Sequence, residues 1–155
     1  MRLIAVGTRM PAWVSAGCDE YLRRLRPALR VDIVELAPGP RSAGTPVERA
    51  MEDEARRQLG RLAKDEYVVA LDERGKMLDS LKLAQMIQQC ANDSIKNLVF
   101  LVGGAYGMHP DVLQRAQFKW SLSALTFPHQ LVRLILAEQL YRACTINKNE
   151  KYHHK

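Results

Sequence analysis

Three short segments of this sequence place glycines, small polar residues or charged residues where a ligand could be held. They are residues 71–75 (LDERG), 103–107 (GGAYG) and 121–128 (SLSALTFP). The first two directly follow uninterrupted apolar runs, and the third precedes the last long stretch of helical periodicity. If the apolar runs are parallel strands, these segments lie beyond strand carboxyl ends, where α/β sheets bind their ligands.

The glycines of residues 103–107 lack a Cβ, so a ligand can approach the backbone closely. The segment is neither a G-x-G-x-x-G dinucleotide fingerprint nor a P-loop, because no phosphate-gripping Lys-Ser pair follows it. Turns between a strand and a helix often need glycine for their own geometry. These residues alone therefore leave ligand contact and a purely structural turn equally open.

Residues 121–126 alternate small, polar and apolar side chains. Their backbone N–H and C=O groups could hydrogen-bond the edge of an adenine, which needs one donor and one acceptor. The alternative is a short strand followed by a helix cap at Thr126, and the residues alone favour that alternative.

Proton-handling residues lie near the end of the chain. Tyr152 and His153 can each move a proton, although the polar composition of residues 147–155 is typical of a frayed end. Glu138 and Arg142 are spaced i, i+4 with the acid first, the favourable order on a helix. A surface ion pair and a role in a site are equally open for this pair.

The elements that must position these residues alternate along the chain. Strand-like apolar runs occupy residues 3–6, 31–36, 67–71 and 98–102, with a shorter candidate at 120–122. Helical stripes occupy residues 14–25, 47–62, 81–91, 110–118 and 128–145. This alternation favours an α/β fold with a parallel sheet flanked by helices.

The start of the second helix carries a capping signature. Thr45 suits the N-cap, Pro46 suits the first turn, and Glu48 would complete a capping box. The loop of residues 38–44 before it is rich in proline and glycine, so we expect it to be irregular. The basic residues of this helix are more typical of a solvated face than of an RNA contact.

The last helix is apolar around most of its circumference, so it must be buried on more than one side. In a chain this small, that pattern predicts a subunit interface. The residues that produce the pattern are Leu131, Val132, Leu134, Ile135, Leu136, Ala137, Leu140, Tyr141, Ala143 and Cys144.

Length and composition limit the number of domains and the class of protein. The 155 residues fit one domain, residues 1–155, and 47% of them are hydrophobic, enough for one core. The formal charge of +6 favours a polyanionic partner without excluding an ordinary basic surface. No apolar stretch is long enough for a signal peptide or a membrane span, so we expect a cytoplasmic protein without a membrane partner.

The three cysteines, Cys18, Cys90 and Cys144, lie far apart among apolar residues. We expect buried free thiols, which suits a reducing compartment. Neither the cysteines nor the histidines have metal-ligand spacing, so no metal site is expected.

Taken together, these segments resemble the rRNA large subunit methyltransferase H family, the pseudouridine N3-methyltransferases of the SPOUT superfamily. The resemblance extends over essentially the whole chain. It includes the runs AVGTRM (5–10), EYLRR (20–24), LSALTFPH (122–129) and EQLYRA (138–143), with Tyr152-His153 near the end.

The resemblance implies a SPOUT-type parallel sheet whose C-terminal part forms a trefoil knot, a topology that general folding rules would exclude. It implies S-adenosylmethionine as the methyl donor and an obligate homodimer. The substrate would be a pseudouridine of 23S ribosomal RNA in the assembled 70S ribosome. By position, the donor-binding residues would be Leu71, Gly103, Leu122, Ser123, Ala124, Leu125, Thr126 and Phe127.

The chemistry of N3 methylation suggests roles for four residues. The N3 proton must leave before N3 is a good nucleophile, and His153 is the best candidate base, followed by Tyr152 and Glu138. Arg142 could hold a phosphate or the uracil oxygens. Two features depart from the family pattern: the pair Ala105-Tyr106 in the glycine turn, and two residues rather than one after His153.

Three other functions remain open at this point. A different SPOUT enzyme would methylate a ribose or a tRNA base. A ribosome-binding or assembly factor would keep the fold and transfer nothing. Without the resemblance, a plain nucleotide-binding module would be the first choice, although no phosphate-gripping motif supports it.

Overall fold

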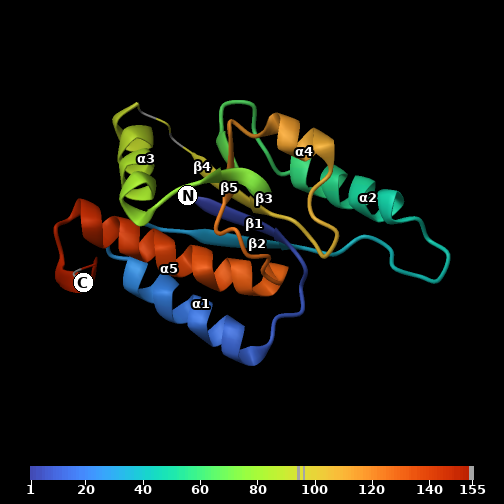
Figure 1. Cartoon of the computed structure of the whole chain (residues 1–155), viewed down its shortest axis with the longest axis horizontal. Coiled ribbons are helices and arrows are strands. Elements are labelled where there is room, and N and C mark those ends of the chain that lie inside the picture. Colours follow the sequence, from blue (N-terminus) through green and yellow to red (C-terminus); the bar gives the residue numbers. More distant parts are fainter. Residues whose placement is uncertain (94, 96, 154–155) are drawn as a thin grey trace.

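The computed structural model describes residues 1–93, 95 and 97–153, apart from the side chain of His153. Its centre is a five-stranded parallel sheet with the strand order β2-β1-β4-β3-β5 (Figure 1). The strands are β1 (Arg2–Val6), β2 (Asp32–Leu36), β3 (Tyr67–Met77), β4 (Leu98–Val102) and β5 (Phe118–Ser121). The predicted α/β fold with a parallel sheet is confirmed.

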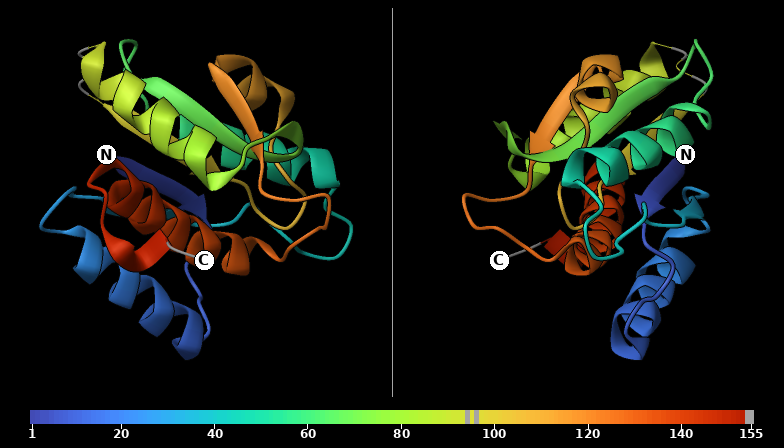
Figure 2. Two further views of the ribbon diagram at one scale, coloured as in Figure 1. Left: turned by 60° about the vertical axis from the view of Figure 1, so that its left-hand side comes forward. Right: turned by 90° about the vertical axis from the view of Figure 1, so that its right-hand side faces the viewer.

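Helices cover both faces of the sheet (Figure 2). One layer contains α1 (Ala12–Leu25), α3 (Ser80–Asn92) and α5 (His129–Asn147), and the other contains α2 (Val47–Leu59) and α4 (Pro110–Arg115). Successive residues of a strand point to opposite faces, so Leu3 packs in the first layer and Ile4 in the second. Burial on both faces explains why β1 and β4 are uninterrupted apolar runs.

β3 is longer than predicted and contains an irregularity at the point where we expected it to end. Both Leu71 and Lys76 pair with Trp120 of β5, so residues 72–75 bulge out of the strand. The sequence pattern predicted a turn after Leu71. The chain instead bulges and rejoins the same sheet, which keeps residues 72–74 beside the ends of β4 and β5.

The predicted capping box is wrong. Pro46 is the N-cap residue of α2, and no side chain caps the helix. The Thr45 hydroxyl instead lies 2.7 Å from the Ser42 hydroxyl, which ties it to the preceding loop. The predicted boundaries of α4, β5 and α5 are each shifted by one to three residues.

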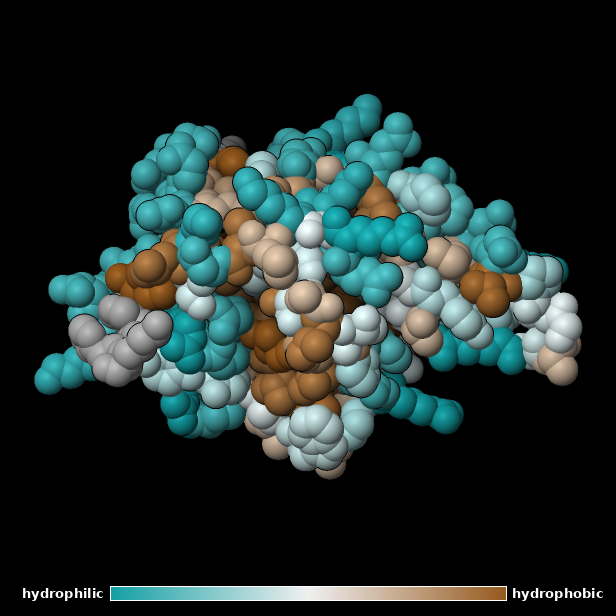
Figure 3. Space-filling view, in the orientation of Figure 1, coloured by the Kyte–Doolittle hydropathy of each residue, from teal (hydrophilic) through white to brown (hydrophobic). Residues whose placement is uncertain are grey.

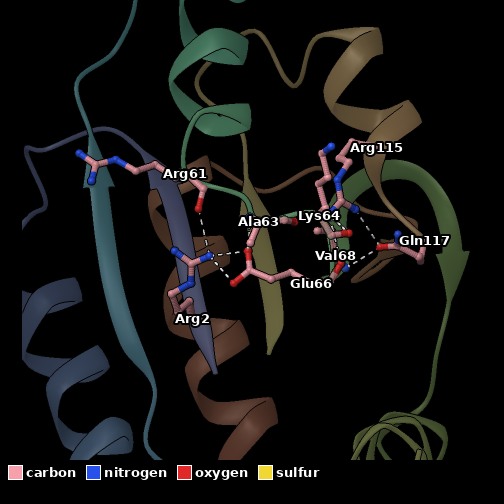
Figure 4. Close-up of polar contacts among 8 residues, drawn as sticks. All are labelled: Arg2, Arg61, Ala63, Lys64, Glu66, Val68, Arg115 and Gln117. Carbon is pink, nitrogen blue, oxygen red and sulfur yellow. Dashed lines mark hydrogen bonds and ion pairs between the residues drawn. The ribbon is translucent and has the colours of Figure 1, made fainter. Parts of the chain in front are cut away.

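Arginines fasten the amino-terminal end of the sheet (Figure 4). Arg2 of β1 donates to the carboxylate of Glu66, which is 4% exposed and also accepts from the Ala63 N–H. Ala63 and Glu66 belong to the loop between α2 and β3. Arg115 of α4 donates to the carbonyls of both residues and to the side chain of Gln117. These guanidinium groups hold the connection between α2 and β3 in place.

The three cysteines are free, as predicted; Cys18 and Cys90 are buried and Cys144 is half-buried. Within the described ranges, no helix is long and apolar enough to cross a membrane.

Candidate active site

A cleft of about 910 Å³ lies at the carboxyl ends of β3, β4 and β5. Its wall is built from the three segments singled out in the sequence, together with the first turn of α5. Their contributions are residues 71–74, 103–107, 121–123 and 125–129, along with Val132. The volume is in the range of pockets that enclose a cofactor-sized ligand.

Strand register brings the three segments together. Leu71 of β3 pairs on one side with Val102 of β4 and on the other with Trp120 of β5. Gly103, which follows Val102, therefore leaves the sheet beside the point of β3 that Trp120 contacts, and Ser121, the last residue of β5, pairs with Met77 just beyond the bulge. Of the eight predicted donor-binding residues, seven line the cleft. Ala124 is exposed on the same loop and is not part of the wall.

The glycine turn has a structural reason for its glycines. Gly104 and Gly107 form an antiparallel bridge, and Gly107 adopts a φ of +84° that side chains disfavour. A Cβ on Gly103 would lie 2.7 Å from the Gly107 carbonyl oxygen. Gly103 is therefore required for the turn itself, and the turn then presents its backbone to the cleft.

Trp120, which lines the cleft, carries a buried hydrogen-bond donor without a partner among the described residues. Its side chain is buried, and its indole Nε1 has no hydrogen-bond partner among the described residues. A buried N–H without a partner costs about 1–3 kcal/mol, so an acceptor on a ligand would be favourable here. From the sequence, Trp120 was predicted only as the first residue of a short strand, with no role in a site.

The segment after Trp120 leaves most of its backbone N–H and C=O groups without a hydrogen bond to another backbone group. Ser121 Oγ donates to the Ser123 carbonyl, and the Leu125 N–H donates to Ser123 Oγ. In the described structure, residues 123–127 make no hydrogen bond between backbone groups. This segment can therefore still supply the donor and the acceptor that an adenine edge needs. The alternative that the residues alone favoured included a helix cap at Thr126, but the N-cap residue of α5 is Pro128 and no side chain caps the helix.

A buried arginine fastens α5 to the end of β1 and to β2. Arg133 is 1% exposed and donates to Glu35 Oε1 at 2.7 Å, to the Val6 carbonyl at 2.9 Å and to the Gly7 carbonyl at 2.6 Å. It thereby fixes the turn after β1, where Gly7 has a φ of +112°. Sequence reasoning missed this residue. Its signal was a single charge between Val132 and Leu134 in an apolar helix.

His129 lies at the start of α5, in the cleft wall. Burial lowers the pKa of its imidazole, and the positive charges of Arg133 and Arg41 lower it further. The ring is therefore neutral at neutral pH and can donate or accept a hydrogen bond. From the sequence, His129 was expected not to bind a metal and was given no other chemical role.

Three of the four predicted catalytic residues form one cluster on α5 and the following 3-10 turn, η1 (Lys151–His153). Arg142 Nη2 donates to Glu138 Oε1 at 2.6 Å, and the Tyr152 hydroxyl donates to the same oxygen at 3.1 Å. The Arg142 guanidinium lies 4.9 Å from the centre of the Tyr152 ring, and Tyr141 packs edge-on against that ring. The side chain of His153 is outside the described structure.

Electrostatics define what this cluster can do. Burial raises the pKa of the Tyr152 phenol well above its ordinary value, and hydrogen bonding to Tyr21 and the Glu138 charge add to the effect. Tyr152 therefore stays protonated and acts as a donor, which counts against it as a base. Glu138 in turn raises the pKa of Arg142, whose charge is permanent at any working pH.

The cluster and the cleft are separate in this chain. Glu138, Arg142 and Tyr152 are absent from the described wall of the cleft, where α5 contributes His129 and Val132. Glu138 lies six residues beyond Val132, which is about 9 Å along a helix axis. The structure thus gathers seven of the predicted donor-binding residues at one place and three of the four predicted catalytic residues at another. Across the described residues, no group of His, Cys, Asp and Glu is arranged as metal ligands.

Comparison with known proteins identifies the family. The family model described as "Predicted SPOUT methyltransferase" matches residues 1–153. The ribosomal RNA large subunit methyltransferase H of Alkalilimnicola ehrlichii is 48% identical over 153 residues, covering 99% of this chain and 97% of that one. The protein of the same name from Stenotrophomonas maltophilia is 47% identical over 152 residues, covering 98% and 97%.

Solved structures agree at the level of the fold. A methylase family protein from Haemophilus influenzae superposes with a TM-score of 0.56 at 11% identity, covering 99% of this chain and 70% of that one. A tRNA methyltransferase from Aquifex aeolicus superposes with a TM-score of 0.51 at 14% identity, covering 92% and 69%. The predicted SPOUT fold is confirmed, and the trefoil knot follows from it as an implication. This chain belongs to the SPOUT methyltransferase family, among the ribosomal RNA large subunit methyltransferase H proteins.

Proposed function

We propose that this enzyme transfers a methyl group from S-adenosylmethionine to N3 of a pseudouridine in 23S ribosomal RNA. It would act on the assembled 70S ribosome in the cytoplasm, as a homodimer of single-domain subunits spanning residues 1–155. The observation that carries the proposal is the near full-length similarity to proteins named ribosomal RNA large subunit methyltransferase H. The cleft at the strand ends supplies a site of suitable size for the donor.

The cleft residues fit an adenosine-containing donor. Apart from the Ser123 carbonyl and the Leu125 N–H, the backbone groups of residues 123–127 can read the adenine edge, and Trp120 Nε1 can donate to a ligand oxygen or nitrogen. Leu71, Gly103 and Leu122 offer apolar or backbone surface at the ends of the three strands. Bound S-adenosylmethionine supplies a methyl group on a positively charged sulfur, which leaves as a neutral thioether.

The residues of this chain then have to position the acceptor and remove its proton. Transfer breaks the bond from sulfur to the methyl carbon and forms a bond from that carbon to N3, whose proton passes to a base. We assign that base to His153. Tyr152 donates a hydrogen bond, Glu138 holds Tyr152 and Arg142 in place, and Arg142 offers its charge to a phosphate or a uracil oxygen.

An apolar surface supports the homodimer. Figure 3 shows hydrophobic residues gathered over the region where α5 and α1 lie in Figure 1. Leu131, Leu134 and Ile135 of α5 are each only half-buried in the single chain, and Trp13 of α1 is 63% exposed. Packing α5 against a second subunit would bury these side chains, as the all-round apolar pattern of the helix requires.

The structure narrows the set of basic residues that could contact the ribosome. Arg57 donates to the carbonyls of Ala37 and Pro38 and pairs with Asp53, so it already fastens the preceding loop, whereas Arg56 makes only an exposed pair with Asp53 on its own helix. Within the part of the chain that the structure describes, no ion pair involves Lys64. The +6 net charge favours association with RNA, while specificity would come from the shape of the ribosome.

Mass spectrometry of ribosomal RNA tests the proposed activity. Ribosomes are incubated with the full chain and a methyl-labelled donor, and the nucleosides of each RNA are analysed. We expect one labelled pseudouridine in large-subunit RNA. A label on a ribose or on tRNA would identify a different SPOUT enzyme, and no label at all would indicate a binding factor without transferase activity.

Deleting residues 152–155 tests the assignment of the tail. We expect methylation to be lost while donor affinity, measured by calorimetry, stays near the wild-type value, because Tyr152, the tail residue whose side chain the structure describes, does not line the cleft of its own chain. A truncated enzyme that methylates ribosomes at the wild-type rate would show that the tail has no catalytic role.

A further inference from the structure

An exposed aromatic ring stands at the mouth of the cleft. Tyr106 lies at the tip of the glycine turn, lines the cleft and is 46% exposed. The guanidinium carbon of Arg41, from the loop between β2 and α2, lies over the ring at 5.6 Å from its centre. The contact joins two loops, because Arg41 and Tyr106 are 65 residues apart in the sequence.

Both loops are fastened to α2, so the ring and the guanidinium have a fixed base. Glu54 of α2 accepts from the Gly39 N–H at 2.9 Å, and the same buried carboxylate lies directly beneath Gly104. Arg57, one turn further on, donates to the Pro38 carbonyl at 3.0 Å. The tight bridge between Gly104 and Gly107 then holds Tyr106 at the tip.

The charge of Arg41 is available to a ligand. Among the residues that the structure describes, no carboxylate lies within ion-pair distance of its guanidinium, whereas most other arginines of this chain have such a partner. Its positive charge also contributes to the lowered pKa of His129, so its field extends to the cleft wall.

We propose that Tyr106 and Arg41 form a stacking platform for an unstacked base of the RNA substrate, beside the nucleotide that is methylated. An aromatic ring stacks on any nucleobase, and a guanidinium plane both extends the stack and attracts the phosphate backbone. One face of the ring carries Arg41, and the exposure of the side chain leaves the remainder open. The proposal rests on the proposed function, because it requires an RNA substrate at this cleft.

The test is steady-state methylation of ribosomes by the full-length enzyme at saturating donor, with the ribosome concentration varied. For Tyr106→Ala we expect the KM for ribosomes to rise about ten-fold, within the range measured for loss of one stacked base. We expect kcat to change little, because the platform contacts neither the methyl group nor the base that receives it. Tyr106→Phe keeps the ring and should stay close to wild type.

Two arginine variants separate stacking from charge. Arg41→Ala should raise the KM for ribosomes, and Arg41→Lys should restore part of the loss because it keeps the charge without the plane. Arg30→Ala is the matched control, since it removes an exposed arginine beside the amino end of β2, opposite the cleft. Donor affinity measured by calorimetry should be unchanged in all variants.

The outcomes distinguish this proposal from the proposed function. An unchanged KM in Tyr106→Ala and Arg41→Ala, with wild-type enzyme active on ribosomes, overturns the platform and leaves the activity intact. Weakened donor binding in Tyr106→Ala also overturns it, because the ring would then belong to the donor site. A wild-type enzyme that transfers no methyl group to ribosomal RNA overturns the proposed function itself.

Discussion

Two arginines on α5 should separate stability from activity. Arg133 and Arg142 each pair with a glutamate, but the side chain of Arg133 is 1% exposed and that of Arg142 is 32% exposed. We predict that Arg133→Met strongly destabilises the protein while Arg142→Met leaves it folded and inactive. Methionine fills much of the same volume, so the comparison isolates the loss of the guanidinium.

The magnitude follows from the partners that each arginine leaves behind. Without Arg133, the carbonyls of Val6 and Gly7 lose their donor, whereas the 39% exposed Glu35 can return to water. An orphaned buried acceptor costs about 1–3 kcal/mol, so the total loss for the two carbonyls should be about 3 kcal/mol. For a protein of 155 residues this corresponds to a fall in Tm of about 6–12 °C. A partly exposed pair such as Arg142 and Glu138 contributes about 0–1 kcal/mol.

Urea unfolding monitored by circular dichroism measures both values. Protein concentration must be equal for all variants, because association of a dimer adds to apparent stability. Donor binding and ribosome methylation are then measured on each folded variant. If Arg133→Met unfolds at the wild-type urea concentration, the hydrogen bonds to the turn after β1 do not hold the fold, and the argument from burial is refuted.

Three further predictions follow from other parts of the structure. Glu66→Ala leaves the Ala63 N–H without its acceptor, while the 28% exposed Arg2 can return to water, so the free energy of unfolding should fall by about 1–3 kcal/mol; Glu20→Ala on the exposed face of α1 should change it little. Equal urea midpoints for these two variants would contradict this. The pKa of His129 is lower in the folded chain than in the unfolded one, so the unfolded chain binds more protons as pH falls. The neutral, buried His129 therefore contributes to stability above pH 6.5, and this contribution is lost as pH falls through the folded pKa. His129→Gln should therefore flatten the loss of Tm between about pH 7.5 and 5.5, and an unchanged slope would exclude this cause. Trp120→Phe keeps an aromatic ring beside Phe100 and removes the N–H, so donor affinity by calorimetry should fall about five- to ten-fold, and an unchanged affinity would exclude the hydrogen bond.

The parts of the fold that follow from local physics were predictable from the sequence. β1 and β4 are apolar on both faces because helices cover both faces, and that pattern is visible in any single run. The cleft segments were also predictable, since ligands bind at the carboxyl ends of parallel strands wherever the strands lie. What these residues cannot reveal is which strands are neighbours. The pairing of Leu71 with both Val102 and Trp120 depends on contacts between distant parts of the chain.

The errors have similar causes. Thr45 has the right type and spacing for an N-cap, but its hydroxyl is used by Ser42 of the preceding loop. The bulge at residues 72–75 reads locally as a turn, because only the pairing with β5 shows that the strand resumes. Arg133 was missed because an apolar helix pattern averages over a single charge, and its partners lie more than 90 residues away. The knot came from the resemblance and from no local pattern.

α5 accounts for the distance between the cleft and the cluster that holds Tyr152. An α-helix is stiff, so the distance of about 9 Å along its axis from Val132 to Glu138 stays fixed within one folded subunit. For Tyr152 to reach an acceptor base at its own cleft, the tail would have to leave Glu138, breaking the bond to Oε1 and the ring contacts with Tyr141 and Arg142. A dimer packed through α5 avoids that cost, because each subunit can offer its assembled cluster to the cleft of the other. The separation seen in one chain is therefore an argument for the proposed homodimer, independent of the apolar surface of the helix.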